Sequence, residues 1–529
     1  FERRYFQSKK KIIIINLNPF VNNTKGFYFM RKRITCFISA VVFLCATLMG
    51  RIGYIVFGGE YTVSQGYNSY SLTACEIPTT LYYSDMGKIN NNKTVYLAVI
   101  RPNEKCIGEL YSLFDYQKRN DIIEKLKKGY PIIEKLDTDT PSSLKYIKII
   151  KATEEKSTDM QIINKESSGL LYYVKNKNGK IKVNFSVDAR GRLLEGDDGT
   201  VIYDDYSTTS GLKLTINKKI QAIAQNTAKS INNGCVIIMN TEDSSILACV
   251  NKPSDSYVNK ALSQYAVGSI FKLVVAACAI ENNVFLQYNC NGKIKVGDTE
   301  FSCQGKKAHK NQGLKDALAN SCNCYFVNLA LTLGQDKLLK TANEFGFADN
   351  TTLYGDWNVK NASLPNKSDL ASKGQLALFG FGQGKFTASP LQMCNVLCTI
   401  ANGGTYNKSK LVSSIVDDRK KQTEIKYQKE KRILTKSQAK RLIEYMRYVV
   451  TDGTGANAET YRHKSAGKTA TAQTGQYNFG IEKLNTWFAG VYPYDNPKYA
   501  IVIMTENGIS GSSDCCPVFR TIVENLDDM

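Results

Sequence analysis

The hydrophobic and polar positions divide the chain into three parts. Residues 34–57 are almost continuously apolar and follow a basic cluster at 31–33, residues 58–208 are mixed and polar, and residues 209–529 alternate strand-like and helical spacings. An apolar run of this length can span a bilayer as one helix. Basic residues before the span predict a cytoplasmic N-terminus and an extracytoplasmic chain after it.

A cleaved signal peptide is the alternative to a permanent anchor. The apolar run is longer than a usual signal-peptide core and no Ala-x-Ala site ends it, so the pattern favours an uncleaved transmembrane helix over 34–57. Residues 1–33 are then a cytoplasmic tail. Because the chain begins with Phe1, residues 1–29 are either native or upstream read-through before a start at Met30.

The middle part shows no catalytic constellation. It contains short β-like runs at 94–100 and 182–187 and a helical stretch around 121–128. We therefore interpret residues 58–208 as a mixed pedestal or interaction domain.

The last part predicts an α+β domain over 209–529. A strand at 211–216 and a helix at 217–231 precede a hairpin signal, and two more strands lie near the C-terminus. The hairpin strands are at 234–239 and 245–250, and the C-terminal strands are at 486–491 and 498–504. Mainly helical patterns separate the two pairs, which implies an antiparallel sheet with a helical insert.

Composition adds a strong positive charge. With 69 Lys+Arg against 48 Asp+Glu the formal net charge is +21, which raises the possibility of nucleic-acid binding. Lys is spread along the chain among Asn, Ile and Tyr without an Arg-rich stripe, which is typical of an AT-rich coding bias. We therefore expect no nucleic-acid partner and assign the charge to a surface that faces an anionic cell envelope.

The spacing of the cysteines and the number of histidines do not indicate a metal site. The 15 cysteines are irregularly spaced and contain no CxxC pair, and His309 and His463 are the two histidines. The sequence thus predicts no metal, no cofactor and no disulfide framework. If the external thiols are unpaired, the exterior is not strongly oxidising.

A possible nucleophile lies where an apolar helix begins. Ser269-Ile270-Phe271-Lys272 precedes the apolar run 273–280, and residues at i and i+3 share one helix face. Burial lowers the pKa of an ammonium group, so a neutral Lys272 could take the proton of the Ser269 hydroxyl. A helix N-terminus also favours developing negative charge. This chemistry requires no histidine.

The pattern Ser-x-x-Lys alone is weak because it occurs elsewhere by chance. Five other matches lie in the tail, in polar or strand-like stretches or in a polar helix, and none precedes a strongly apolar helix; they begin at Ser8, Ser142, Ser210, Ser437 and Ser465. Context therefore singles out Ser269.

Two further elements follow in order. Ser321-Cys322-Asn323 lies on a predicted turn between helices, where a hydroxyl and an amide could relay a proton and hold a substrate amide, although a helix cap explains it equally well. Residues 467–473 alternate like an edge strand and contain Lys468, which could bind a carboxylate. Gly-Lys-Thr also suggests a phosphate loop, but Arg462 stands where that loop requires glycine.

SxxK, SxN and a Lys-Thr strand in this order resemble the penicillin-binding proteins and serine β-lactamases. The surrounding sequence is similar to class B, monofunctional penicillin-binding proteins in six segments: Gln264–Lys272, Ala319–Phe326, Gly380–Gly384, Ser389–Gln392, Ile400–Gly404 and Trp487–Gly490. The resemblance is strong over 209–529. It implies the penicillin-binding, β-lactamase-like transpeptidase fold behind the anchor and pedestal.

The resemblance also implies roles for individual residues. Ser269 would be the acylated nucleophile and Lys272 its base, with backbone N–H groups of Ser269 and Thr471 forming the oxyanion hole. The remaining implied residues complete proton transfer and substrate binding: Ser321, Asn323, Lys468, Thr469 and Thr471. The family strand usually has Gly after Lys-Thr or Lys-Ser, whereas this chain has Ala470. The extra methyl group would crowd a substrate or β-lactam, or shift the strand slightly.

The implied function is cross-linking of peptidoglycan by D,D-transpeptidation at the outer face of the membrane, with stem peptides as substrates and β-lactams as inhibitors. The resemblance also implies a separate membrane glycosyltransferase as partner. Two alternatives remain: a β-lactamase or β-lactam sensor of the same fold, and a scaffold of a division, elongation or sporulation complex whose catalysis Ala470 impairs.

Overall fold

The computed structural model describes residues 24–57, 69–89, 91–137, 144–166, 168–174, 179–188, 190–204, 211–417, 419–427 and 431–529. It separates into two units, Phe1–Ser69 and Tyr70–Met529. In the first unit, helix α1 spans Thr24–Phe57, and large apolar side chains between Met30 and Tyr54 are exposed. Over Met30–Ile52 this helix is long and apolar enough to cross a membrane, and within the described residues it is the one helix that is. The helix begins before the predicted span and includes the basic cluster.

The N-terminal part of the second unit consists of two three-stranded sheets and short helices. Strand β3 is central between β4 and β5, and β6 is central between β1 and β7. The bounds are β1 Ser69–Glu76, β3 Asn92–Ile100, β4 Ile132–Leu136, β5 Ile147–Glu155, β6 Lys180–Ser186, β7 Thr200–Asp204, α2 Ile107–Leu113 and α3 Tyr116–Leu126. The predicted runs at 94–100 and 182–187 are thus strands, whereas the helix predicted around 121–128 begins five residues earlier, capped by Asp115.

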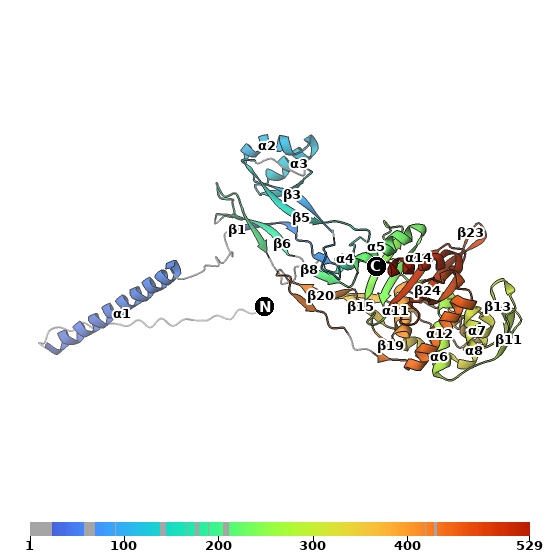
Figure 1. The fold of residues 1–529 in the computed structure, drawn as a ribbon. Coiled ribbons are helices and arrows are strands. Elements are labelled where there is room, and N and C mark those ends of the chain that lie inside the picture. Colours follow the sequence, from blue (N-terminus) through green and yellow to red (C-terminus); the bar gives the residue numbers. More distant parts are fainter. Residues whose placement is uncertain are drawn as a thin grey trace, which may run out of the picture. The chain divides into compact units, whose positions relative to one another are not determined.

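Alternation along β3 explains how these layers pack. Val95, Leu97 and Val99 face one hydrophobic cluster shared with β6, while Ala98 and Ile100 face another shared with α2 and α3. Successive side chains of a strand point to opposite faces, so one strand contributes to both cores. Figure 1 shows the backbone of these elements, with α2 and α3 on one side of β3 and β5 and with β1 and β6 on the other.

The N-terminal part also contributes to the core of the C-terminal part of this unit, residues 211–529. Strand β2 (Thr80–Tyr82) pairs in parallel with β8 (Gly211–Leu214), and Leu81 and Ile162 belong to the large hydrophobic core of that part. Strands β20 (Val412–Val416) and β21 (Gln422–Glu424) complete this sheet, and α4 spans Leu170–Val174. The predicted boundary at 208/209 lies outside the described residues.

The centre of the C-terminal part is a five-stranded antiparallel sheet in the order β10-β9-β25-β24-β23. Its bounds are β9 Gly234–Asn240, β10 Ile246–Lys252, β23 Ala466–Asn478, β24 Ile481–Tyr492 and β25 Tyr499–Glu506. Strands from both ends of the domain therefore form one sheet, and β23 is an edge strand. The predicted α+β architecture is confirmed (Figure 1).

Both faces of this sheet are buried. Val236 and Ile238 pack with α5 (Lys218–Thr227) and α14 (Cys516–Asp527), while Ile237 and Met239 face the large helical core.

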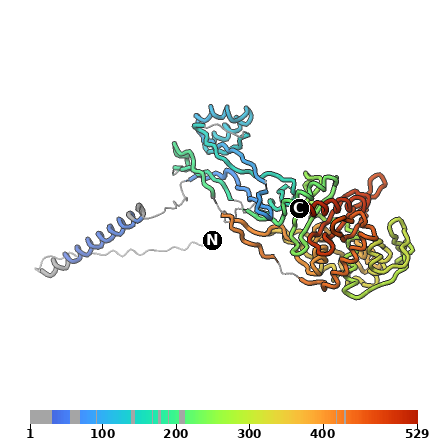
Figure 2. Tube along the Cα trace, viewed as in Figure 1, coloured from blue at the N-terminus to red at the C-terminus, as the bar shows by residue number. Residues whose placement is uncertain are grey.

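The Cα trace in Figure 2 follows the helical insert between β10 and β23. Its helices are α6 Lys272–Glu281, α7 Leu314–Ala319, α8 Asn323–Leu333, α9 Gln335–Glu344, α10 Lys373–Phe379, α11 Pro390–Ala401 and α12 Lys436–Asp452.

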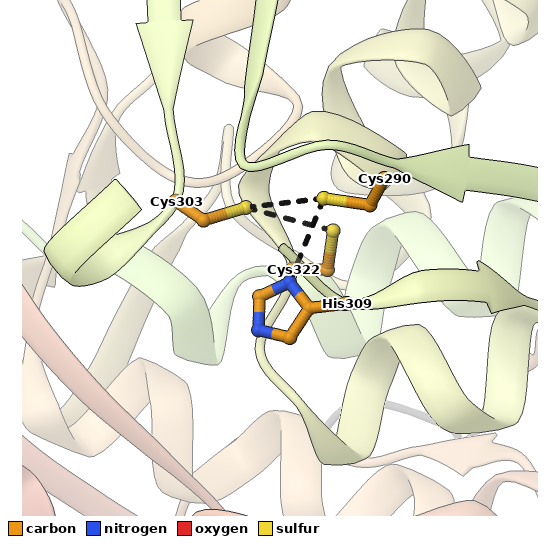
Figure 3. Close-up of side chains that lie close together, drawn as sticks. All are labelled: Cys290, Cys303, His309 and Cys322. Atoms are coloured by element: carbon orange, nitrogen blue, oxygen red, sulfur yellow. Dashed lines mark hydrogen bonds between the residues drawn. The ribbon is translucent and has the colours of Figure 1, made fainter. Parts of the chain in front are cut away.

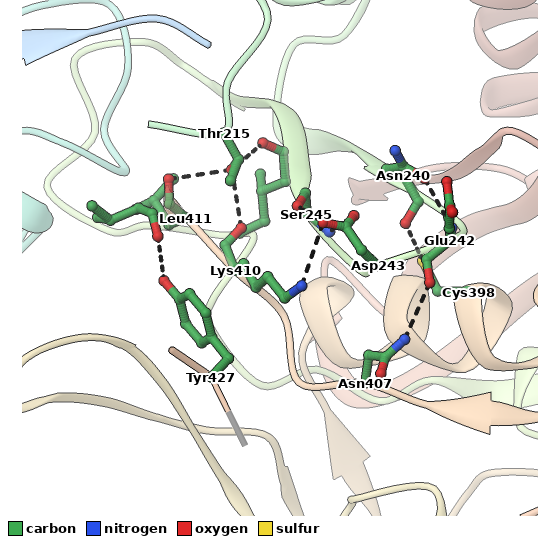
Figure 4. A network of polar contacts seen from close by, with 12 residues as sticks. Thr215, Asn240, Glu242, Asp243, Ser245, Cys398, Asn407, Lys410, Leu411 and Tyr427 are labelled. Atoms are coloured by element: carbon green, nitrogen blue, oxygen red, sulfur yellow. Dashed lines mark hydrogen bonds and ion pairs between the residues drawn. The ribbon is translucent and has the colours of Figure 1, made fainter. Parts of the chain in front are cut away.

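A polar network fastens the β9–β10 turn to the segment before β20 (Figure 4). The Thr215 hydroxyl lies 2.7 Å from the carbonyl oxygen of Ile246 and 3.0 Å from that of Lys410. The Lys410 ammonium reaches the Asp243 carboxylate at 3.4 Å, and the Asn407 amide donates to the Glu242 carbonyl. These contacts satisfy polar groups where the two sheets of the domain meet.

Candidate active site

Ser269 lies on a tight turn between the helical core and β23. It belongs to a 3₁₀ turn over Gly268–Ile270, just before α6, rather than to the α-helix itself. Gly268 has φ +60°, and a Cβ there would lie 3.0 Å from the Cβ of Ala472 in β23. On its other side, the Gly268 N–H donates to the carbonyl of Gly382. A Cβ on Gly382 would lie 2.2 Å from the Gly268 oxygen. Two glycines thus allow the close approach that places Ser269.

Lys272 is the first residue of α6 and is completely buried. Its Nζ donates to the Asn323 Oδ1 at 2.7 Å and to the Ser321 carbonyl at 2.9 Å, and lies 3.4 Å from the Ser321 Oγ. Burial lowers the pKa of Lys272 to about 8. A substantial fraction of this amine is therefore neutral near pH 8. Within the described residues no hydrogen bond joins it to the Ser269 hydroxyl; such contacts are often loose before substrate binds.

Ser321 and Asn323 flank the start of α8 after the turn that follows α7. Ser321 adopts φ +52°, which is uncommon for a residue with a side chain and points to a functional constraint. The Asn323 Nδ2 donates to the Ser302 carbonyl at 2.9 Å, so the amide is held with its oxygen toward Lys272. The predicted turn between helices is confirmed.

Lys468 enters the same region from the opposite side, on β23. It is also completely buried, and its Nζ donates to the Thr469 carbonyl at 2.9 Å. Burial and the positive charge of Lys272 hold the pKa of Lys468 well below its ordinary value. Two buried amines close enough to repel each other cannot both be protonated cheaply.

Thr454 is a site residue that the sequence analysis missed. Its Oγ1 lies 2.6 Å from the Thr469 Oγ1, and its backbone N–H donates to the Ala319 carbonyl at 3.1 Å. It thereby bridges the end of α7 and strand β23. The signal in the sequence is the turn-forming Gly453-Thr454-Gly455 after a long helix; at Gly453 a Cβ would lie 2.4 Å from the Ala319 oxygen.

A cavity of about 570 Å³ joins these elements. Most of the predicted residues line it, whereas Lys272 and Lys468 lie behind its wall. The lining comprises Ser269, Ser302, Cys303, Gln304, Gly305, Ser321, Asn323, Thr454, Thr469, Ala470, Thr471, Gln473, Leu484, Ser510, Gly511 and Ser512. No carboxylate is among them. The cavity can receive an extended peptide along β23, and Ser269 lies in its lining.

Ala470 is only 4% exposed, so its methyl group packs mostly inside the protein. On one side of its backbone lies the N-terminus of the short helix α13 (Gly511–Asp514), where a Cβ at Gly511 would lie 2.7 Å from the Ala470 oxygen. The backbone N–H of Gly511 points to the Thr471 hydroxyl at 3.4 Å. The polar loop 510–512 thus forms part of the wall, a role that the sequence did not reveal.

Comparison with known proteins matches residues 234–524 to the model of the penicillin binding protein transpeptidase domain. The chain belongs to this family. Stage V sporulation protein D of Bacillus subtilis is 28% identical over 378 residues, covering 65% of this chain and 57% of that protein. A peptidoglycan D,D-transpeptidase FtsI homolog of Mesostigma viride is 26% identical, covering 64% of this chain and 65% of that protein. The chain thus spans less than two thirds of the length of these relatives.

A solved structure with the same fold is penicillin binding protein 3 of Mycobacterium tuberculosis in complex with aztreonam. It has a TM-score of 0.62 at 18% identity, and the match covers 87% of this chain and 97% of the other. The match extends well beyond the catalytic domain. The general fold that the sequence predicted is therefore confirmed.

Proposed function

We propose that the chain is a D,D-transpeptidase that cross-links peptidoglycan stem peptides through an acyl-enzyme on Ser269. The observation that carries the proposal is the buried Lys272 amine, held by Ser321 and Asn323 behind the wall of a cavity that Ser269 lines. A buried amine with a lowered pKa can accept a proton near neutral pH. Named D,D-transpeptidases among the relatives support the same reaction.

The first half of the reaction forms the acyl-enzyme. The Ser269 hydroxyl gives its proton to the neutral Lys272 amine, and its oxygen attacks the carbonyl of the penultimate D-Ala. Backbone N–H groups of Ser269 and Thr471, both at the cavity, stabilise the oxyanion. The C–N bond then breaks, and the amine of the terminal D-Ala leaves with the proton.

The second half transfers the acyl group. An amine of a neighbouring stem peptide attacks the ester carbonyl and loses a proton to the buried amines of Lys272 and Lys468. The Ser269 oxygen then leaves and is reprotonated. Ser321 and Asn323 hold the Lys272 amine. The buried Lys468 donates to the Thr469 carbonyl and so orients Thr469, which positions the substrate. A β-lactam enters as far as the ester and stays there.

The lining of the cavity favours transpeptidation over β-lactam hydrolysis. Rapid hydrolysis needs a base that activates water against the ester, and no carboxylate lines the cavity in the described part of the chain.

We propose that α1 anchors the chain with the catalytic domain outside, because the basic cluster precedes the span. A separate membrane glycosyltransferase would then supply the glycan strands.

The test uses the purified full-length chain with a peptide ending in D-Ala-D-Ala and a free D-amino acid as acceptor. Mass spectrometry should show release of D-Ala and formation of the exchanged peptide. Ser269→Ala should abolish exchange, while Ser437→Ala, in an exposed Ser-x-x-Lys pair, should leave it unchanged. Rapid multiple-turnover hydrolysis of penicillin would instead identify a β-lactamase.

A further inference from the structure

The segment between α6 and α7 is a small β-rich insert with little hydrophobic core of its own. Its strands are β11 Tyr288–Cys290, β12 Lys293–Val296, β13 Thr299–Ser302 and β14 Lys310–Gln312. Most of its side chains are exposed, and Val296 and Phe301 are its buried large apolar residues. A segment of this kind cannot be held by hydrophobic burial alone, and small folds of this sort need another constraint.

Four potential metal ligands converge where this insert meets α8 (Figure 3). Cys290 ends β11, Cys303 follows β13, His309 precedes β14, and Cys322 caps the N-terminus of α8. Their ligand atoms all lie within 4.8 Å of one another. The three cysteines are buried, and His309 is half-buried. Residues as much as 32 positions apart in the sequence are thus gathered around one point.

Three of the six distances within this group fit the edges of one coordination tetrahedron, and the others are within 4.8 Å. Bonds of about 2.3 Å from zinc to sulfur and about 2.0–2.1 Å to nitrogen imply edges of about 3.8 Å between two sulfurs and about 3.6 Å between sulfur and nitrogen. The Cys290–Cys303 and Cys303–Cys322 sulfurs are each 3.7 Å apart. The Cys290 Sγ lies 3.6 Å from the His309 Nδ1.

The backbone around the group is arranged as around bound thiolates. The Gly292 N–H points to the Cys290 sulfur and the Tyr325 N–H to the Cys322 sulfur, each at 3.4 Å. Such contacts orient and stabilise metal-bound sulfur. Sulfur separations of 3.7 Å are far beyond the roughly 2.05 Å of a disulfide, and all the cysteines of the group are free thiols.

We propose that Cys290, Cys303, His309 and Cys322 bind one zinc ion, which fastens the insert to the start of α8. Three thiolates and one imidazole in a tetrahedral arrangement form a closed structural zinc site. Such a site leaves no open position for substrate, so the metal has a structural rather than a catalytic role. Soft sulfur ligands favour zinc over magnesium, calcium or manganese.

The site is directly connected to the candidate active site. Cys322 stands between Ser321 and Asn323, and Cys303 lines the cavity. The insert also supplies the Ser302 carbonyl that receives the Asn323 amide. Bound zinc would therefore hold Ser321 and Asn323 in place around Lys272, a positioning role that rests on the proposed function. The existence of the metal site does not depend on that function.

The test measures zinc in the full-length chain, purified in detergent under anaerobic, reducing conditions. Elemental analysis should find about one zinc per chain. Cys290→Ser and His309→Ala should each lose most of it, whereas Cys398→Ser, at a buried thiol next to the Asn240 carbonyl, should retain it. Cobalt bound in place of zinc should give the absorption of a tetrahedral thiolate complex, a measurement on wild-type protein that does not depend on how the variants fold.

The positioning role has a separate readout. Removal of zinc by a chelator should slow labelling by a fluorescent penicillin by roughly 10²-fold, and added zinc should restore it, because small displacements of catalytic groups have effects of this size. Wild-type protein without metal, or with a Cys303–Cys322 disulfide, would overturn the zinc site. Bound zinc whose removal leaves labelling unchanged would overturn the positioning role while leaving the proposed reaction intact.

Discussion

The five-stranded sheet and the β11–β14 insert hold their parts of the active site in different ways. The sheet is buried on both faces, and its strands pair over long registers. The insert has short strands, mostly exposed side chains and a group of thiols and imidazole at its base. Hydrophobic burial therefore positions Lys468 and Thr469. Ser321 and Asn323 instead flank Cys322, which belongs to the group of thiols and imidazole. One candidate active site thus combines two kinds of support.

The largest effect is expected from the amine that both regions surround. Lys272→Ala should slow acylation by a fluorescent penicillin by about 10³-fold, since general-base catalysis contributes on the order of 10²–10⁴. The matched control is Lys440→Ala, because Lys440 occupies the same position of an exposed Ser-x-x-Lys pair. Equal labelling of the two variants would refute the assigned base.

Truncations in the two regions should differ in their cost to stability. Ile237→Ala, in the middle of β9, should lower the free energy of unfolding by about 3 kcal/mol, because a buried Ile→Ala change leaves a cavity. Ile294→Ala, at a half-buried position of the insert, should cost about 1 kcal/mol or less. Denaturant unfolding measures both. Similar costs would show that the insert is held by apolar packing like the sheet.

Thr454→Val should have a smaller effect, at the point where α7 meets β23. The change keeps the shape and removes the hydroxyl that contacts Thr469, a hydrogen bond of about 1 kcal/mol. We expect the acylation rate to fall by roughly fivefold with the thermal midpoint shifted by only a few degrees. A rate equal to that of wild type would remove Thr454 from the site.

The smallest effect is expected at Ala470. Because its methyl group is mostly buried, Ala470→Gly should cost about 1 kcal/mol of stability, and should change the rate of penicillin labelling by less than about threefold. Thermal unfolding and labelling kinetics on the same preparation provide the check. A large gain in rate would show that the methyl group does obstruct the β-lactam.

The difference between the two regions also explains what the sequence could predict. The continuous apolar run of β9, which is buried on both faces, and the apolar helix after Ser269 have clear signatures, so the sheet and the helical insert were predicted correctly. The start of α3 was missed because Tyr116–Arg119 carries no apolar periodicity. Thr454, the hydrogen-bond partner of Thr469, was missed because the two residues meet only in the folded protein and no local pattern connects them.

The thiol group was missed for a related reason. Three of its residues lie at the ends of the short strands β11, β13 and β14, and the fourth caps α8. Because no CxxC spacing occurs, the linear sequence does not indicate that His309 lies near Cys322. Ser302, Gln304 and Gly305 reach the cavity through the same fold of the insert. The sequence could identify residues that chemistry requires but not the neighbours that only the folded insert brings beside them.

The central claim is that Ser269 forms a covalent ester. The direct measurement is peptide mass spectrometry of the full-length chain after reaction with benzylpenicillin. The account predicts one penicilloyl adduct, on the peptide that contains Ser269, and none in Ser269→Ala. An adduct on another residue, or an equal adduct in the Ser269→Ala variant, would contradict it.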